Sequence, residues 1–372
     1  MVETQRSEDV AVYNERSLRA LDRAIALSLG EFSLVLVRCN YKRLRDRMVR
    51  RLRELAEERY TIRELTLPES VTTLYTTIQT YGHGMCPDNE PCPALFVLGI
   101  ESVVALDDLL TSSNQVRDEF RKRLPFPLVL WVNDEVLASI VRFAPDFASW
   151  AATPIRFEIA TTELIDFLRQ KADSLFNTVL GAESGRYAPW RVCTHHSTLN
   201  LATGCRSRLE LDSALRDLQS RQHVINPQLE ASLQFVFGQY DYASDFIDSA
   251  FAHYQQSLRF WRASNNLERQ GVLLFYMGLC HCRFADLHRS QRHRNLEEAW
   301  PYLLQCVDVF SQAGRQDLVA QFITQLAEVL QRLEAWDALQ ILCQKAVTLH
   351  QLYGSKVQLA QDYGFLAEVS LS

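Results

Sequence analysis

The first 160 residues alternate between two hydrophobic patterns, which predicts strands separated by amphipathic helices. Strands are expected at 32–39, 60–67, 94–100, 126–133 and 154–159. The runs 94–100 and 126–133 are almost continuously apolar, as strands buried on both faces of a sheet must be. Helical crossovers between such strands favour parallel pairing, so residues 1–160 are predicted to form a three-layer α/β domain.

A different pattern begins at Thr161, where helical periodicity replaces the strand signals for the rest of the chain. Residues 161–224 are predicted as a helical linker region, interrupted between 181 and 206 by glycine and proline. Residues 225–372 are predicted as an all-α domain of paired amphipathic helices. The fold class expected from the sequence is therefore an α/β domain followed by a helical domain.

Three segments of the helical half resemble one another, and each follows another amphipathic helix. Each has an alanine at a position where we expect the helix to pack tightly, namely Ala250, Ala299 and Ala338. These pairs resemble tetratricopeptide repeats in a variant longer than the standard ~34 residues, and an irregular helical domain is the alternative. The last unit has a first helix and no second one, so we expect either a fragment of a longer array or an atypical cap.

The segment 32–48, FSLVLVRCNYKRLRDRM, reads as a strand that runs straight into a helix. Nucleotide-binding proteins place their phosphate loop at such a junction. With ALFVLGIES at the Walker B position and WVND near the sensor position, this order resembles the core of STAND-class P-loop ATPases. The whole chain resembles cyanobacterial-type tetratricopeptide-repeat proteins that carry such an N-terminal domain. The resemblance implies an ATPase fold followed by partner-binding repeats.

The residues that phosphate chemistry requires are missing from this segment. A phosphate loop reads GxxxxGK[ST], in which glycines let N–H groups converge on phosphate and the hydroxyl holds Mg²⁺. Here Lys42 is followed by Arg43, the turn has no glycine, and Glu101 is the acid available at the Walker B position. We therefore predict a degenerate loop, no ATP hydrolysis and no cofactor. The alternative is a nucleotide switch that uses a non-standard site at Lys42, Glu101 and Asn133.

Composition and charge narrow the classes of partner. The chain of 372 residues has a net formal charge of −6, and its apolar runs are too short to span a bilayer. We therefore expect a cytoplasmic protein without membrane contact. The helix predicted after the first strand is basic, with Lys42, Arg43, Arg45, Arg47, Arg50, Arg51 and Arg53. Interleaved acids and missing aromatic residues favour a solvated face or a docking surface for an acidic partner over nucleic-acid binding.

The predicted linker contains one cluster of residue types that can bind zinc, at Cys193, His195, His196 and Cys205. Their spacing matches no common closed zinc module, so no metal is expected and these four residues are candidates only. Most of the nine cysteines are expected to be small buried hydrophobes in a reducing compartment. No Ser-His-Asp or Cys-His arrangement can be argued from spacing, so no catalytic residue is assigned.

The sequence thus predicts a non-catalytic regulatory or scaffold protein that binds other proteins through helical repeats. The expected contact surface is the concave side of the array, lined by the first helix of each pair. Candidate contact residues are Gln321, Gln325, Glu328 and Gln361, whose polar side chains suit hydrogen bonding to a peptide backbone. A merely solvated face is the alternative. The identity of the partner and the oligomeric state stay open.

Overall fold

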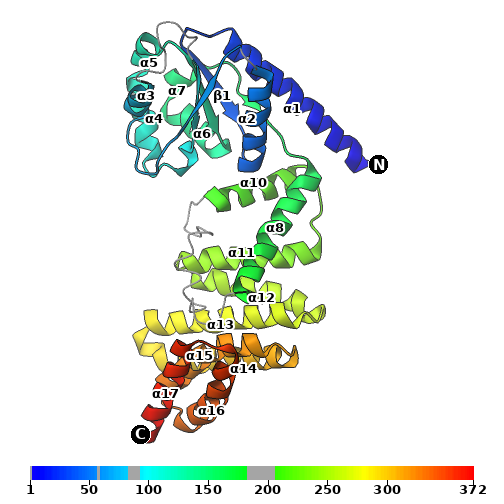
Figure 1. Cartoon of the computed structure of the whole chain (residues 1–372), viewed down its shortest axis with the longest axis vertical. Helices are drawn as coiled ribbons and strands as arrows, with labels where there is room; N and C mark the ends of the chain where they lie inside the picture. Colours follow the sequence, from blue (N-terminus) through cyan, green and yellow to red (C-terminus); the bar gives the residue numbers. More distant parts are fainter. Residues whose placement is uncertain (1, 57–58, 83–92, 182–205) are drawn as a thin grey trace. The chain divides into compact units, whose positions relative to one another are not determined.

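The structure is a computed structural model that describes residues 2–56, 59–82, 93–181 and 206–372. The chain divides into two compact units, Met1–Leu164 and Ile165–Ser372 (Figure 1). The first unit contains a sheet with helices, and the described residues of the second unit form helices. The predicted order of an α/β domain followed by a helical domain is confirmed. The finer boundaries at 160 and 224 stay predictions.

Five parallel strands form the sheet, one within each segment predicted as a strand. They are β1 (Ser33–Arg38), β2 (Ile62–Thr66), β3 (Ala94–Leu98), β4 (Pro127–Val132) and β5 (Ile155–Arg156). Their spatial order is β2-β3-β4-β1-β5, and every pairing is parallel. Every residue of β3 and β4 is buried, which explains their continuously apolar sequences.

Helices cover the sheet in two layers (Figure 1). One layer consists of α1 (Val2–Ala26) and α2 (Lys42–Ala56). The other contains α3 (Leu74–Gly82), α4 (Leu106–Gln115), α5 (Arg117–Arg123), α6 (Asp134–Phe143) and α7 (Pro145–Ala148). The helices of this second layer share one hydrophobic core with side chains from β1 to β4.

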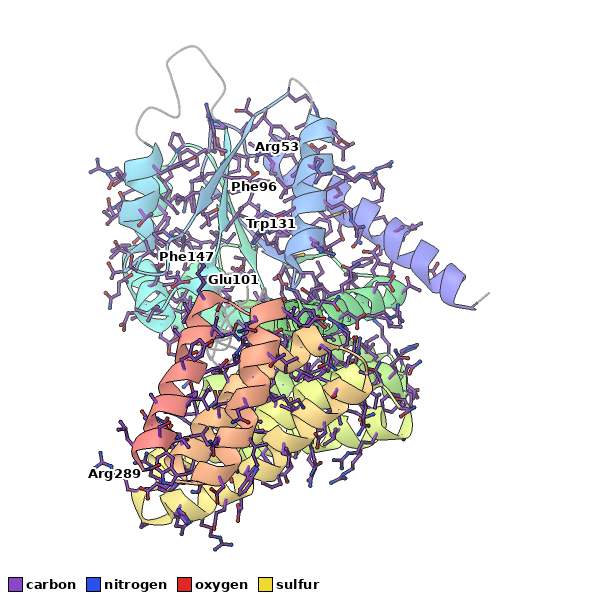
Figure 2. All side chains as sticks on the ribbon, turned by 60° about the horizontal axis from the view of Figure 1, so that its bottom comes forward. Arg53, Phe96, Glu101, Trp131, Phe147 and Arg289 are labelled. Carbon is purple, nitrogen blue, oxygen red and sulfur yellow. The ribbon has the colours of Figure 1, made fainter. Side chains whose placement is uncertain are left out.

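Alternate residues of the strands point to the two helix layers. The indole of Trp131 on β4 stacks on Phe157 with ring centroids 5.6 Å apart and lies 6.1 Å from the ring of Phe96 on β3. Figure 2 shows Phe96 and Trp131 between Arg53, near the end of α2, and Glu101, which follows β3. Glu101 therefore marks the end of the sheet at which the parallel strands finish.

The second unit is an array of helices that starts within α8 (Thr161–Leu180). The others are α10 (Arg206–Ser220), α11 (Pro227–Ala243), α12 (Ile247–Ala263), α13 (Leu267–Leu287), α14 (Arg292–Gln312), α15 (Gln316–Arg332), α16 (Trp336–Tyr353) and α17 (Lys356–Leu371). Each helix from α11 to α16 packs on the next one in sequence. The described helical region is therefore repeat-like, as the sequence predicts.

Small residues let neighbouring helices of the array approach closely. A Cβ atom placed on Gly238 of α11 would overlap the ring of Tyr254 on α12. One on Gly271 of α13 would meet the ring of Phe310 on α14 at 2.5 Å. Among the alanines expected to pack tightly, Ala250 and Ala299 are both completely buried. These contacts hold each helix against the following one.

Two local predictions differ from the structure. The amphipathic spacing of apolar residues in 17–30 predicts a helix there, whereas α1 already starts at Val2. The added part makes tertiary contacts that the spacing does not reveal, because Asn14 bonds to the backbone of Glu158 and Glu15 pairs with Arg51. Tight packing was also expected at Ala338, which is only half-buried. The next residue of α16, Leu339, is completely buried and takes the packing position instead.

Candidate functional site

The carboxyl ends of β1 and β4 form the position where an open parallel sheet most often binds a ligand. From β1 the chain continues through α2 to β2, and from β4 it continues through α6 to β5, on the opposite side of β1. Ligands of such sheets bind between two neighbouring strands whose connections leave in opposite directions. The residues that follow these strands therefore form the candidate binding position of the sheet.

The side chains at this position bind one another. The guanidinium of Arg38, at the end of β1, donates to the carboxylate of Asp134, with Nη2 2.6 Å from Oδ2. Asn40 Nδ2 donates to the same Oδ2 at 2.8 Å, and the N–H of Asp134 donates to Asn40 Oδ1 at 3.0 Å. The N–H of Cys39 donates to the carbonyl oxygen of Val132 at 2.9 Å. The ends of the two strands are thus tied together by a polar network.

Glu101, the acid at the expected Walker B position, lies in a short 3₁₀ turn that follows β3. Its carboxylate is 3.6 Å from Nη1 of Arg45, and the two side chains are only 9% and 7% exposed. A carboxylate buried against a guanidinium already has its charge compensated. The geometry therefore gives Glu101 a pairing role that the sequence analysis did not assign, because the position of Arg45 in space was unknown.

Lys42 and Asn133 take ordinary positions at the starts of helices. Lys42 is the exposed first residue of α2. Asn133 is the N-cap of α6, and its side chain accepts a hydrogen bond from the N–H of Val136 at 2.8 Å. Such a cap stabilises the helix by about 1 kcal/mol. Asn133 thus has a structural role whether or not a ligand binds nearby.

Acidic side chains from neighbouring elements pair with the basic helix α2. Arg47 lies 3.0 Å from Glu163, Arg51 lies 2.7 Å from Glu15, and Arg53 pairs with Glu64. These side chains are mostly exposed, so each pair is worth less than about 1 kcal/mol. Together the pairs reduce the positive potential of the helix surface.

The candidate zinc residues Cys193, His195, His196 and Cys205 lie outside the described residues. Within the described ranges, no group of three or more potential ligands is close enough to hold a metal ion. Five of the cysteines are buried there, namely Cys39, Cys280, Cys282, Cys306 and Cys343. Burial raises the pKa of the Cys282 thiol to about 12, which disfavours the reactive thiolate. No helix of the described part of the chain is both long and apolar enough to cross a membrane.

The candidate partner-contact residues lie in different environments. Gln321 on α15 is only 5% exposed, and its Nε2 donates to the carbonyl oxygen of Val179 on α8 at 3.0 Å. Gln325 and Glu328 of α15 are half-buried, and burial raises the pKa of Glu328, against opposing effects of Gln325 and Arg332. Gln361 on α17 is exposed. The structure therefore brings Gln321 against the chain's own helix α8.

Helix α8 contacts the array through side chains that the sequence analysis did not single out. Phe176 stacks on Phe235 of α11, with centroids 4.1 Å apart, and makes an edge contact with Trp261 of α12. The guanidinium of Arg269 on α13 lies over both Phe176 and Trp261 and pairs with Asp173 of α8 at 2.6 Å. The only available signal was the helical spacing of apolar residues in α8, which does not identify their neighbours.

A buried histidine also fixes the last two helices. Nδ1 of His350 on α16 is 2.5 Å from Oδ2 of Asp362 on α17, and both side chains are completely buried. Nε2 of the same ring lies 2.7 Å from the carbonyl oxygen of Ala320 on α15. Because both nitrogens face oxygen atoms, this network joins three successive helices of the array.

Comparisons with known proteins assign no family. No protein-family model matches the chain, and no curated protein matches it. Among solved structures, the chain is similar to one described as BtubC (BKLC) from P. vanneervenii. That match has 14% sequence identity and a TM-score of 0.37, and covers 57% of this chain and 84% of the other. A likeness at this level assigns neither activity nor partner.

Proposed function

We propose that this chain is a cytoplasmic, non-catalytic regulatory or scaffold protein whose α/β domain resembles a STAND ATPase core without a working phosphate site. The observation that carries the proposal is the pairing of charged groups at the carboxyl edge of the sheet. There Arg38 and Asn40 bind Asp134, and Arg45 faces Glu101. A phosphate group or Mg²⁺ ion would have to disrupt these bonds before it found ligands of its own.

The turn between β1 and α2 supports the same conclusion. A phosphate loop offers several backbone N–H groups that converge on one anion. In this turn the N–H of Cys39 donates to Val132, and the side chains of both Cys39 and Tyr41 are buried. The turn is therefore occupied by side chains, and part of its backbone is bonded within the sheet.

Titration calorimetry of the full chain with ATP and Mg²⁺ tests this part of the proposal. We expect no heat of binding at micromolar protein and nucleotide concentrations. The alternative function is a STAND-type nucleotide switch, favoured by the positions of Lys42, Glu101 and Asn133 just after β1, β3 and β4. Micromolar binding that disappears in Lys42→Ala would contradict the scaffold proposal and support this switch.

The helical array is the proposed surface for protein partners. Arrays of paired helices bind peptides or helices along one extended face and need no catalytic residue. Gln361 on α17 is an exposed candidate, and Gln340 on α16 is an exposed glutamine for a matched control. In capture from native cell extract with the full chain as bait, Gln361→Lys should lower the recovery of specific partners and Gln340→Lys should not. Equal recovery with both variants would mean that Gln361 is not part of the partner-binding surface.

A further inference from the structure

Helix α8 lies across several helices of the array instead of pairing with one of them. Its carboxyl half spans from Asp173, which pairs with Arg269 of α13, to Val179, whose carbonyl oxygen accepts from Gln321 of α15. Phe176 between them stacks on Phe235 of α11. Asp173 and Val179 are six residues apart, or ~9 Å along the helix axis, so one short segment contacts α11, α13 and α15, the first helices of three successive pairs.

The chemistry of this contact has three parts that recur in recognition of helical peptides. An aromatic anchor, Phe176, is completely buried against Phe235 and Trp261. A charge-assisted bond joins Asp173 to Arg269, whose guanidinium is held 4.5 and 4.4 Å from the ring centroids of Phe176 and Trp261. Ser232 fixes the same guanidinium, whose Nη1 donates to its Oγ at 2.8 Å.

The third part is a hydrogen bond to the peptide backbone. Gln321 donates to the carbonyl oxygen of Val179, in the last turn of α8, where helix carbonyls lack intrahelical partners. This bond depends on the helix end and on no particular side chain. We name Phe235, Trp261, Arg269 and Gln321 the α8-contact face.

We propose that the α8-contact face is a partner-binding surface of the array, in addition to the candidate Gln361, and that α8 is its resident, intramolecular ligand. The proposal rests on the partner-binding function proposed above and names the partner's chemistry. The partner presents an amphipathic helix with aspartate and phenylalanine at the spacing of Asp173 and Phe176, and its last turn lies at the position of Val179. The partner replaces α8 on this face. Because only molecules in which α8 has left the face can bind, the apparent affinity for the partner equals the intrinsic affinity multiplied by the fraction of such molecules.

Charge and burial favour such a helix over an extended peptide. The apolar stripe of α8 has the three-to-four residue spacing of one helix face, and its buried members are Leu164, Leu168, Ala172, Leu175, Phe176 and Val179. Arg269 is only 16% exposed, so any occupant that covers it without an acid leaves a buried cation uncompensated. A competing helix therefore needs both the aromatic residue and the acid.

A peptide in trans tests the proposal directly. A fluorescent peptide of residues 161–181 is titrated with the full chain, either wild type or Phe176→Ala, and binding is followed by anisotropy. Because Phe176→Ala weakens the resident helix, the peptide should bind this variant at least tenfold more tightly than the wild type. Equal affinities, or no binding to either chain, would overturn the proposal.

Matched peptides test the chemistry of recognition. Asp173→Asn in the peptide removes the charge-assisted bond to Arg269 and should weaken binding about tenfold. Asp166→Asn is the control on the same helix, because Asp166 is exposed and pairs only locally with Arg169 in the described structure. It should change affinity by less than about twofold. Equal losses with both peptides would contradict recognition through Arg269.

Hydrogen exchange of variants of the whole chain distinguishes release of α8 from unfolding of the array. Phe176→Ala should speed exchange in α8 while α13 to α16 stay protected. If Phe176→Ala unfolds the array, the chain with Asp173→Asn is used in its place, and binding of the fluorescent peptide is measured in the same way. Protection of α8 that is unchanged in both variants, or lost only together with the array, would make α8 a fixed part of the fold and overturn the proposal.

Capture of partners from cell extract distinguishes failure of the proposed partner-binding function from failure of the α8 proposal. If neither wild-type chain nor Phe176→Ala captures a protein, the partner-binding function fails, whatever the peptide does. If both chains capture a partner equally while the peptide prefers the variant, the array binds proteins at another face. Stronger capture by Phe176→Ala than by the wild type is the result that the proposal expects.

Discussion

At the scale of single residues, the pair of Arg45 and Glu101 differs from the other ion pairs of α2 by its burial. We expect Glu101→Gln to lower the free energy of unfolding by about 1–3 kcal/mol, because it removes the buried carboxylate and leaves the guanidinium with the half-exposed carboxylate of Asp46. The matched control is Glu163→Gln, which removes the exposed partner of Arg47 and should cost less than about 1 kcal/mol. Urea denaturation of both variants measures the difference, and equal costs would contradict a structural role for Glu101.

Glu328 gives a residue-scale prediction about pH. Burial raises its pKa in the folded protein above the ordinary value of 4.5, so the folded state binds the proton more tightly than the unfolded state. Its contribution to stability is therefore complete below about pH 4 and is lost as the pH rises through the raised pKa. Glu328→Gln should raise the melting temperature at about pH 8, and the gain should shrink near pH 4. A gain that does not vary with pH would argue against this explanation, and Glu297→Gln, at an exposed glutamate, is the control.

At the scale of helices, two glycines within helices separate packing from intrinsic propensity. Gly238 faces Tyr254 without room for a methyl group, whereas a Cβ atom on Gly364 of α17 meets nothing within 4 Å. Alanine gains about 1 kcal/mol of helix propensity at either position, so the difference between the variants isolates overpacking. We expect Gly238→Ala to be about 1–3 kcal/mol less stable than Gly364→Ala, measured by thermal or urea unfolding. Similar stabilities would mean that α11 and α12 separate easily.

The elements themselves were largely predictable, and their neighbours were not. The apolar runs at 94–100 and 126–133 predicted β3 and β4 because burial on both faces permits no polar residue there. The helical spacing in α8 likewise identified a helix. Nothing in either pattern reveals that β1 lies between β4 and β5, or that Phe176 lies against Phe235, because periodicity records which side is buried and not what covers it.

At the scale of the whole molecule, the two units should respond separately to a local change. The α/β unit has its own core beneath α3–α7, and Gly238 lies in the other unit. Hydrogen exchange of Gly238→Ala should therefore lose protection in peptides of α11 to α16 and keep it in peptides of β1, β3 and β4. Loss of protection in both sets would indicate a single cooperative fold.

The sequence by itself determined the two fold classes, the five strands, the repeat-like helices and the lack of phosphate-binding residues after β1. Each of these depends on local spacing or on residue type, which a chain carries before it folds. Tertiary structure alone decided that Arg45 meets Glu101, that Asp134 binds Arg38 and that Gln321 contacts α8. These contacts join residues far apart in the chain, and their energy comes from burial and charge at a place that only the folded packing creates.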